Sequence, residues 1–476
     1  MKSATIVTYL NYTIIFCCFL FSKYIPPPAG LPPISMEVLG IFVGTLWGWI
    51  TFGMGWPSIL GLLAFGMSDY CSMNSALSTA FGTQLIIMIL ALLLLASFVE
   101  QANLTDFVLD LLMSRKSCKG RPFVIFYYFI MAGYIAAILS FGNAVFIIFL
   151  GFFKAMMNKT GIKPHTKTVT CFFIGLMLAM LMSELSLPFK STGLYSIGAY
   201  EAVTGQQVNL MKYVIFMLPI CVSILTLYVL LCKYIFKPDL SMLSNFSHEI
   251  RETSRLNKRQ KYSFVGILIG MFCLLLPSII PASWHIKETF NELGGGGLAL
   301  MVIGILMAVQ VDGKPLMDIR KIGQFFPWAI FFCLAFLFPV AGAISSDTLG
   351  LKQMILADGE AFFRSISTIM AVVCLIALPA FFTNFMNNAV IGITALTIYG
   401  SISGSIEINP NIVFGMIVFA ANLGMFFPAA NPIATMAFAE REIVGFRQLL
   451  VYSFITWAIM CIWSGIICYM YGSIVY

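Results

Sequence analysis

Four short polar sequences interrupt apolar stretches of this chain, and they form two pairs with the same spacing. Asn143 in the first interruption plus 244 gives Asn387, and Pro188 in the second plus 244 gives Pro432. Hydrophobic segments interrupted by Gly, Pro or Asn at matching places in two halves of a chain are typical of the binding site of a secondary transporter. The pattern therefore predicts a site near the middle of a membrane.

The interruptions offer both backbone and side-chain groups to a ligand. An interrupted helix leaves N–H groups, which favour anions, and carbonyls, which favour cations, beside the partial charges of its ends. Side-chain amides and hydroxyls add groups that donate to a carboxylate or coordinate a cation. The alternative is that these side chains only cap helices or hold helices together. The repeated placement favours a site whose candidate side chains are Asn143, Thr383, Asn384, Asn387 and Asn388.

Lys190 lies two residues after Pro188, inside a polar interruption. An ionisable side chain within a membrane is costly and is a functional candidate by default. Its ammonium group either attracts an anionic substrate or stands where another transporter binds a metal cation. Glu184, six residues earlier, is the expected partner, as a structural ion pair or as a proton-sensitive group. The alternative for Lys190 is that its ammonium group extends to a membrane interface.

The composition excludes a soluble domain. The chain is 60% hydrophobic and only 10% charged, with a mean hydropathy of +0.95. Its three histidines lie apart in polar stretches, and its 12 cysteines mostly lie in apolar runs without C-x-x-C spacing. No resident cofactor, metal centre or disulfide framework is therefore expected. The placement of His and Asp offers no acid–base constellation for an enzyme, and paired hairpins argue against the polar rings of a channel.

The apolar stretches predict an all-α polytopic membrane protein with about 11 transmembrane helices and two re-entrant hairpins. The hairpins are residues 122–153 and 366–400, each interrupted near its middle, because exposed backbone at this depth is tolerated only against a cavity or protein. The expected spans are 6–23, 36–54, 56–68, 82–101, 168–187 continuing to 204, 212–236, 262–281, 298–311, 325–345, 410–427 continuing to 438, and 448–471.

Lysine and arginine placement predicts the orientation. With the N-terminus inside and the C-terminus outside, 21 of the 27 basic residues fall on the inner side, five on the outer side and one, Lys190, within the membrane. This bias follows the positive-inside rule and accounts for the net charge of +7 without a nucleic-acid partner. We expect a multi-pass protein of the cytoplasmic (inner) membrane whose two hairpins enter from opposite sides, as in an inverted repeat.

The inverted repeat divides the chain into five expected parts. These are first-repeat scaffold helices (1–121), a first-repeat hairpin and broken helix (122–236), a cytoplasmic linker with an interfacial helix from His248 (237–261), second-repeat scaffold helices (262–365), and a second-repeat hairpin and broken helix (366–476). Each hairpin with its broken helix belongs to the expected transport domain.

Two stretches carry a resemblance to a known family. Ile25–Leu31 followed by Gly40–Gly44 is similar to the Pro-rich entry into the second span of the divalent anion/sodium symporter family, the dicarboxylate, citrate and sulfate carriers of the ion transporter superfamily. Met425–Ala434 resembles the second broken span of that family. The resemblance covers nearly the whole chain. It implies a homodimer in which a transport domain moves against a scaffold as an elevator.

The resemblance also assigns residues, because the family binds carboxylate at its hairpin tips and sodium between each tip and the facing break. With Lys190 and Asn384 added from the polar interruptions, the expected substrate-binding residues are Ser140, Gly142, Asn143, Lys190, Thr383, Asn384, Asn387, Asn388 and Asn431. The matching sodium ligands are Asn387, Asn388, Ala430 and Asn431. Lys190 replaces the small or hydroxyl residues of the first break in the family. We therefore expect the first sodium site to be absent and the ammonium group to supply its charge.

Together these features predict secondary active transport of a small organic anion, a di- or tricarboxylate, across the cytoplasmic membrane. Sodium symport or anion exchange would drive it through an elevator mechanism. The other expected partners are bilayer lipid and a second copy of the chain. The alternative is a proton- or sodium-coupled carrier of another anion or of an amino-acid-like solute.

Overall fold

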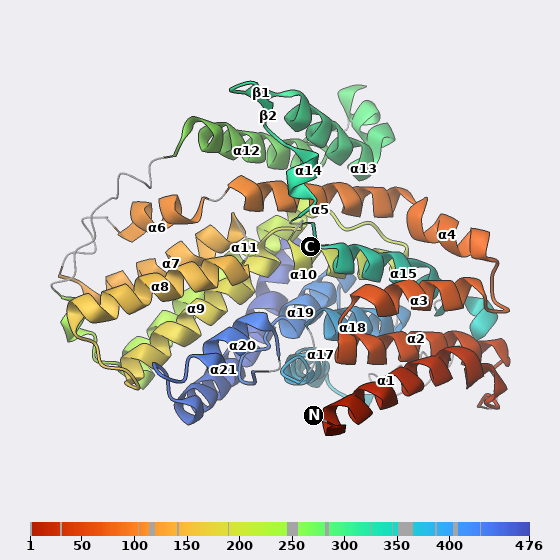
Figure 1. Ribbon diagram of the computed structural model, residues 1–476, viewed down its shortest axis with the longest axis horizontal. Helices are drawn as coiled ribbons and strands as arrows, with labels where there is room; N and C mark the ends of the chain where they lie inside the picture. The colour runs from red at the N-terminus through yellow and green to blue at the C-terminus, as the bar shows by residue number, and fades with distance from the viewer. Residues whose placement is uncertain are drawn as a thin grey trace.

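The computed structural model is almost entirely α-helical, as the composition predicts (Figure 1). It describes residues 2–28, 31–102, 104–113, 120–139, 142–188, 190–244, 256–280, 285–324, 326–344, 346–350, 365–385, 388–402, 408–428 and 430–476. These ranges contain one short antiparallel hairpin, Gln310–Val311 (β1) with Lys314–Pro315 (β2), in which Gln310 pairs with Pro315. The interfacial helix predicted from His248 lies outside the described residues.

The helices before the first hairpin largely match the predicted spans. They are α1 (Lys2–Phe21), α2 (Ile34–Phe52), α3 (Gly55–Gly66), α4 (Met73–Phe81), α5 (Gln84–Ala102) and α6 (Thr105–Met113). The sequence did not predict α4, whose axis is bent by 44° from that of α5. Ser72 begins α4 by accepting a hydrogen bond from the N–H of Ser75, which is a common N-cap.

Helices end at or near the polar interruptions, with α19 as the exception described below. The segments concerned are α7 (Pro122–Ile138), α8 (Gly142–Thr160), α9 (Lys167–Ser186), α10 (Ser191–Thr204), α17 (Thr368–Phe382), α18 (Asn388–Ile402), α19 (Pro410–Ala421) and α20 (Pro432–Ala439). We call residues 139–143 the first tip, 187–190 the first break, 383–388 the second tip and 422–431 the second break. Each tip joins two helices of a hairpin, and each break divides one apolar stretch into two helices.

The remaining helices complete the two halves. They are α11 (Leu210–Leu231, with a π-helical turn at Cys232–Phe236), α12 (Lys258–Ile279), α13 (His285–Ala308), α14 (Ile319–Ile322), α15 (Trp328–Ile344) and α21 (Phe446–Val475), with 3-10 turns at Ser22–Tyr24, Ser241–Leu243 and Asp347–Leu349. Gly294 has a φ of 59° within α13, and the helical parts on its two sides are bent by 91°. A positive φ of this kind favours glycine.

The second break is longer than the sequence predicts. The apolar stretch suggests a helix to residue 427, but α19 ends at Ala421. Asn384 Oδ1 accepts hydrogen bonds from the backbone N–H groups of Met425 (2.8 Å) and Phe426 (3.0 Å). These N–H groups therefore have an acceptor outside their own segment. The predicted helix end was wrong because apolar composition does not reveal an acceptor 41 positions away.

The core of the fold lies around α9. Within the apolar window of α9, 94% of the residues are buried, and the helix packs against α7, α8, α10 and α11. The next helix, α10, packs against α15 and along α18. Figure 1 shows α9, α10 and α19 in the middle of the molecule, with α1, α2 and α3 on one side and α12 and α13 along another edge. Leu187 and Lys190 of the first break are buried, whereas Phe385 of the second tip and Phe427 of the second break are exposed.

The apolar helices agree with a multi-pass membrane protein. Among the described residues, five helices are long and apolar enough to cross a membrane, and the number rises to seven if each of two bent pairs is one span. The shorter apolar helices include α7, α17, α18 and α19. A helix needs about 20 residues to cross a membrane once. Helices of 12–17 residues therefore fit segments that enter the membrane without crossing it. The number of about 11 transmembrane helices stays a prediction.

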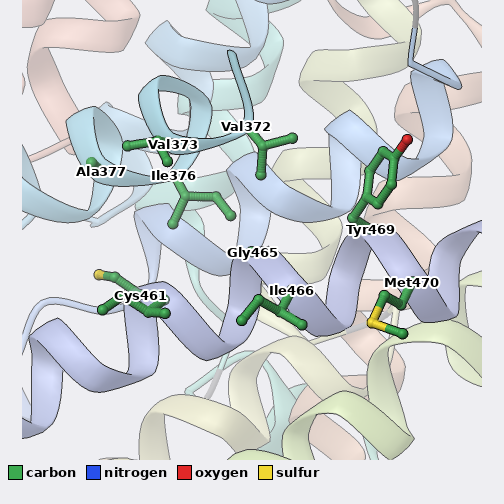
Figure 2. A pocket seen from close by; sticks show the side chains of 10 residues that line it. Val372, Val373, Ile376, Ala377, Cys461, Gly465, Ile466, Tyr469 and Met470 are labelled. Carbon is green, nitrogen blue, oxygen red and sulfur yellow. The ribbon is translucent and has the colours of Figure 1, made fainter. Parts of the chain in front are cut away.

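An apolar groove of about 540 Å³ lies between α17 and α21. Figure 2 shows Val372 and Ile376 of α17 facing Gly465 and Ile466 of α21. A Cβ at Gly465 would stand 3.2 Å from Ile376 Cδ1, so glycine allows the close approach of the two helices. None of the predicted site residues lines this groove. The polar chemistry of the protein lies elsewhere.

Candidate functional site

Most of the predicted site residues lie in the described part of the chain, and only Ser140 and Asn387 lie outside it. The described ones gather around the two tips and two breaks: Gly142, Asn143, Glu184, Lys190, Thr383, Asn384, Asn388, Ala430 and Asn431. Buried among them are Lys190, Thr383 and Asn384, with exposed fractions of 7%, 0% and 0%. A buried polar group needs partners, so the partners define what each residue can do.

The second tip is held by the hydroxyl of Thr383. Its Oγ1 lies 2.6 Å from the carbonyl oxygen of Ala421 and 2.8 Å from Asn388 Oδ1. One hydroxyl proton serves one acceptor at a time. The last residue of α19 and the first residue of α18 are therefore joined through a single side chain, and the tip is fixed against the second break.

Asn384 and Asn431 both stabilise the second break. Asn384, besides accepting from the backbone of the break, donates from Nδ2 to the carbonyl of Ala380 (2.7 Å). Asn431 donates to the carbonyl of Gly424 (2.5 Å) and accepts from the N–H of Ala434 (2.9 Å), which makes it the N-cap of α20. These contacts match the alternative considered from the sequence, in which the polar side chains cap helices or hold helices together. Ligand binding at either residue would have to share or exchange these hydrogen bonds.

Asn422 connects the second tip to the other half of the chain, and the sequence analysis missed it. Its Nδ2 donates to the carbonyl of Leu181 in α9. Its Oδ1 accepts from Asn388 Nδ2 (3.1 Å) and from Thr192 Oγ1 (3.3 Å), at the start of α10. Only 1% of Asn422 is exposed. The available signal was an amide in the interior of the apolar run 410–427.

We call Tyr195, Thr192, Asn422, Asn388 and Thr383 the amide network. The phenol of Tyr195 donates to Thr192 Oγ1 (3.2 Å), and that hydroxyl donates to Asn422. The chain of hydrogen bonds then continues through Asn388 to Thr383. It runs from the first half of the protein to the second tip. Buried networks that are fully bonded fix one arrangement of the elements that they join.

Lys190 lies against the end of the first hairpin's first helix. Its Nζ donates a 2.5 Å hydrogen bond to the carbonyl of Ala137, in the last turn of α7. The last carbonyls of a helix have no helical partners and carry partial negative charge, which favours a cation. The backbone of Lys190 is the N-cap of α10. The buried ammonium group is therefore held between the end of α7 and the start of α10.

The first tip contributes an amide and lies close to a carboxylate. A Cβ at Gly142 would stand 3.4 Å from Glu184 Oε1, so Glu184 reaches the tip. Asn143 is half-buried, and within the described residues its side chain makes no hydrogen bond. Its amide is therefore available to a ligand. The expected pairing of Glu184 with Lys190 stays a prediction.

The first hairpin also contacts the second half of the chain. The Cβ position at Gly142 is 3.7 Å from Ile433 Cδ1, in the first turn of α20. Farther along α8, Lys154 forms an ion pair with Glu440 at 2.9 Å, and both side chains are partly exposed. A pair of this kind contributes about 0–1 kcal/mol. Each hairpin thus meets the broken helix of the other half, and the tips and breaks converge.

At Gly424 the second break passes close to two oxygen atoms of the second tip. A Cβ at Gly424 would stand 2.8 Å from the carbonyl oxygen of Thr383 and 2.9 Å from Asn388 Oδ1. Carbonyl and amide oxygens are the ligands that hard cations prefer. In the described ranges, no cluster of three or more His, Cys, Asp or Glu residues is present. Gly424 was not predicted as a site residue, because its role depends on the tip that folds against it.

The comparisons with known proteins agree on a transporter. The family model described as citrate transporter matches residues 42–413. A curated protein, the sodium-dependent dicarboxylate transporter SdcS of Staphylococcus saprophyticus, is 21% identical over 437 residues, which cover 86% of this chain and 82% of that protein.

Two solved structures share the fold. The YdaH transporter of Alcanivorax borkumensis has a TM-score of 0.54 and 13% identity, over 84% of this chain and 88% of its own. MtrF of Neisseria gonorrhoeae, described with a class of antimetabolite efflux pumps, has a TM-score of 0.56 and 12% identity, over 97% of this chain and 94% of its own. Both are transporters, so the predicted all-α polytopic fold is confirmed.

Proposed function

This chain belongs to the citrate transporter family, and from that premise we propose that it is a secondary active carrier of a small organic anion, a di- or tricarboxylate. Family membership makes it a multi-pass membrane transporter rather than an enzyme. The observation that carries the choice of an anion is the buried ammonium group of Lys190 in the first break. It is bonded to the helix that leads to the first tip, where the amide of Asn143 is available. A buried cation and an amide donor suit a carboxylate.

Coupling at the second tip is proposed to use one sodium ion. Beside Gly424 lie the carbonyl oxygen of Thr383 and Oδ1 of Asn388, and SdcS is named as sodium-dependent. At the first break the ammonium group of Lys190 takes the place of a second cation, because it already binds the carbonyl of Ala137. The carrier therefore works with fewer free cations, as a symporter of altered stoichiometry or as an anion exchanger.

The movement is proposed to be that of an elevator. The two hairpins with their broken helices, residues 122–236 and 366–476, form the transport domain, and residues 1–121 and 262–365 form the scaffold of a homodimer. The amide network and the contacts of α8 with α20 support this division, because they join the two halves of the transport domain. We further propose an inverted repeat in the cytoplasmic membrane, with the N-terminus inside and the C-terminus outside.

Uptake into proteoliposomes tests the substrate and the coupling. Labelled di- and tricarboxylates are offered with and without an inward sodium gradient, to the unmodified chain and to Lys190→Ala. The proposal expects uptake of at least one of these anions and a changed sodium dependence in the variant. Strict sodium dependence that Lys190→Ala leaves unchanged would rule out the role of Lys190. A thermal-shift panel that includes sulfate and amino acids tests the alternative, a proton- or sodium-coupled carrier of another anion or amino-acid-like solute.

A further inference from the structure

Three buried hydroxyl groups between α10 and α18 have no hydrogen-bond partner among the described residues. They are Ser196 and Tyr200 of α10 and Tyr399 of α18. Ser196, Tyr200 and Tyr399 are 0%, 1% and 2% exposed. Buried hydroxyls in folded proteins nearly always have a partner, either a protein group or an ordered water molecule.

The neighbours of these groups show that partners within the protein are normally found. Thr397, two residues before Tyr399 on α18, donates to the carbonyl of Ile393 (2.8 Å). Tyr213 and Tyr228 are fully buried, and they donate to backbone carbonyls at 2.8 and 2.7 Å, respectively. Within the described residues, the three hydroxyls between α10 and α18 make no such contact.

The three groups lie along one interface. Thr192, Ser196, Tyr200 and Thr204 follow one another at intervals of four residues, so they form a row on one face of α10. That face lies against α18, since a Cβ at Gly392 would stand 3.9 Å from Ser196 Oγ. Tyr399 follows Gly392 by seven residues, about two helical turns, and therefore lies on the same face of α18.

The row has one end in the site and the other at the surface. Thr192 belongs to the amide network, so the first hydroxyl of the row already contacts Asn422. At the other end, Thr204 closes α10 and accepts a hydrogen bond from the N–H of Gln206 (3.2 Å), and residues 205–207 are exposed. Unpartnered hydroxyls thus occupy the buried stretch between the network and the solution.

We propose that α10 and α18 hold a file of ordered water molecules that connects the amide network to the solution beyond Thr204. Water is the ligand that fits, because each molecule makes about three hydrogen bonds and both donates and accepts. In the proposed carrier the file gives the coupling cation access to the second tip. That role rests on the proposed function, whereas the file itself does not.

Hydroxyl-radical footprinting of the full chain in lipid nanodiscs tests the file. Radicals generated from bound water label tyrosine rings beside that water, even when the rings are buried. We expect Tyr200 and Tyr399 to be labelled at least threefold faster than Tyr213 and Tyr228, which are as deeply buried and hydrogen-bonded to protein. Equal labelling of the four tyrosines would overturn the proposal.

Isosteric variants test whether the file serves transport. Ser196→Ala and Tyr399→Phe remove hydroxyls but keep the shape of the interface, and we expect each to lower the labelling of Tyr200 at least threefold. The matched control, Thr397→Val, removes a hydroxyl that binds its own helix and leaves the labelling unchanged. Slower sodium-dependent uptake in the two variants supports the access role. If labelling is lost but uptake is unchanged, the access role is overturned and the presence of the ordered water molecules still stands.

Discussion

Replacing Asn422 by alanine removes the side chain that joins the second tip to the first half of the chain. Its three hydrogen bonds go to Leu181, Asn388 and Thr192. A buried hydrogen bond contributes about 0.5–1.5 kcal/mol net, and a buried donor left without a partner, here Asn388 Nδ2, costs about 1–3 kcal/mol. The expected loss is about 3 kcal/mol or more. That is a large part of the ~5–15 kcal/mol that stabilises a folded domain.

The assay compares thermal unfolding midpoints in one detergent. The matched control is Asn409→Ala, because Asn409 is exposed and caps the start of α19 by accepting from the N–H of Asn411. Loss of such a cap costs about 1 kcal/mol, so this variant should unfold well above Asn422→Ala. A double-mutant cycle with Asn388→Ala isolates the direct contact, for which a coupling of about 0.5–3 kcal/mol is expected.

Two outcomes would refute this account of Asn422. One is an unfolding midpoint for Asn422→Ala that equals that of Asn409→Ala. The other is strict additivity with Asn388→Ala, since residues that share a hydrogen bond should couple. Either result would mean that the amide network does not hold the two halves together.

Three further predictions concern the two breaks and the helix behind the second tip. Lys190→Met should raise the KM for the anion at least tenfold in proteoliposomes, because a hydrogen bond to a charged group contributes about 1.5–3 kcal/mol, and Lys190→Arg should retain most of the affinity. Gly424→Ala should raise the sodium concentration for half-maximal uptake at least tenfold, because its methyl group would push the second break away from the oxygens of Thr383 and Asn388; Gly342→Ala, where a Cβ meets nothing within 4 Å, should leave it unchanged. Trp457→Phe should lower the unfolding free energy by about 1 kcal/mol more than Trp56→Phe. The reason is that Trp457 Nε1 donates to a carbonyl in the last turn of α17 (3.0 Å), whereas half-buried Trp56 has no hydrogen bond among the described residues.

The positions of the helix ends follow from local sequence, and these were predicted well. Pro188 cannot continue a helix, and α9 ends at Ser186. Asn431 before Pro432 is a strong helix start, and α20 begins at Pro432. In each case the residue that interrupts the helix also determines its own backbone geometry. Local chemistry was therefore sufficient.

The partners of the buried polar groups do not follow from local sequence. Asn422 contacts a carbonyl 241 residues away, and Lys190 contacts one 53 residues away. A single amide or ammonium group in an apolar run does not encode which helix end approaches it. The length of the second break was misjudged for the same reason, because its backbone is held by Asn384. Predicting these contacts requires the packing of the helices.

An ammonium group that is part of the chain stays with the carrier through a whole transport cycle. A sodium ion in its place would be delivered across the membrane and would add one charge to every turnover. Lys190, bound to the carbonyl of Ala137, would move inward with the loaded carrier and outward with the empty one, so its net displacement is zero. It therefore takes up none of the ~2.3 kcal/mol that each charge gains on crossing 100 mV. Anion accumulation would respond less steeply to voltage than in a carrier whose cations are all free.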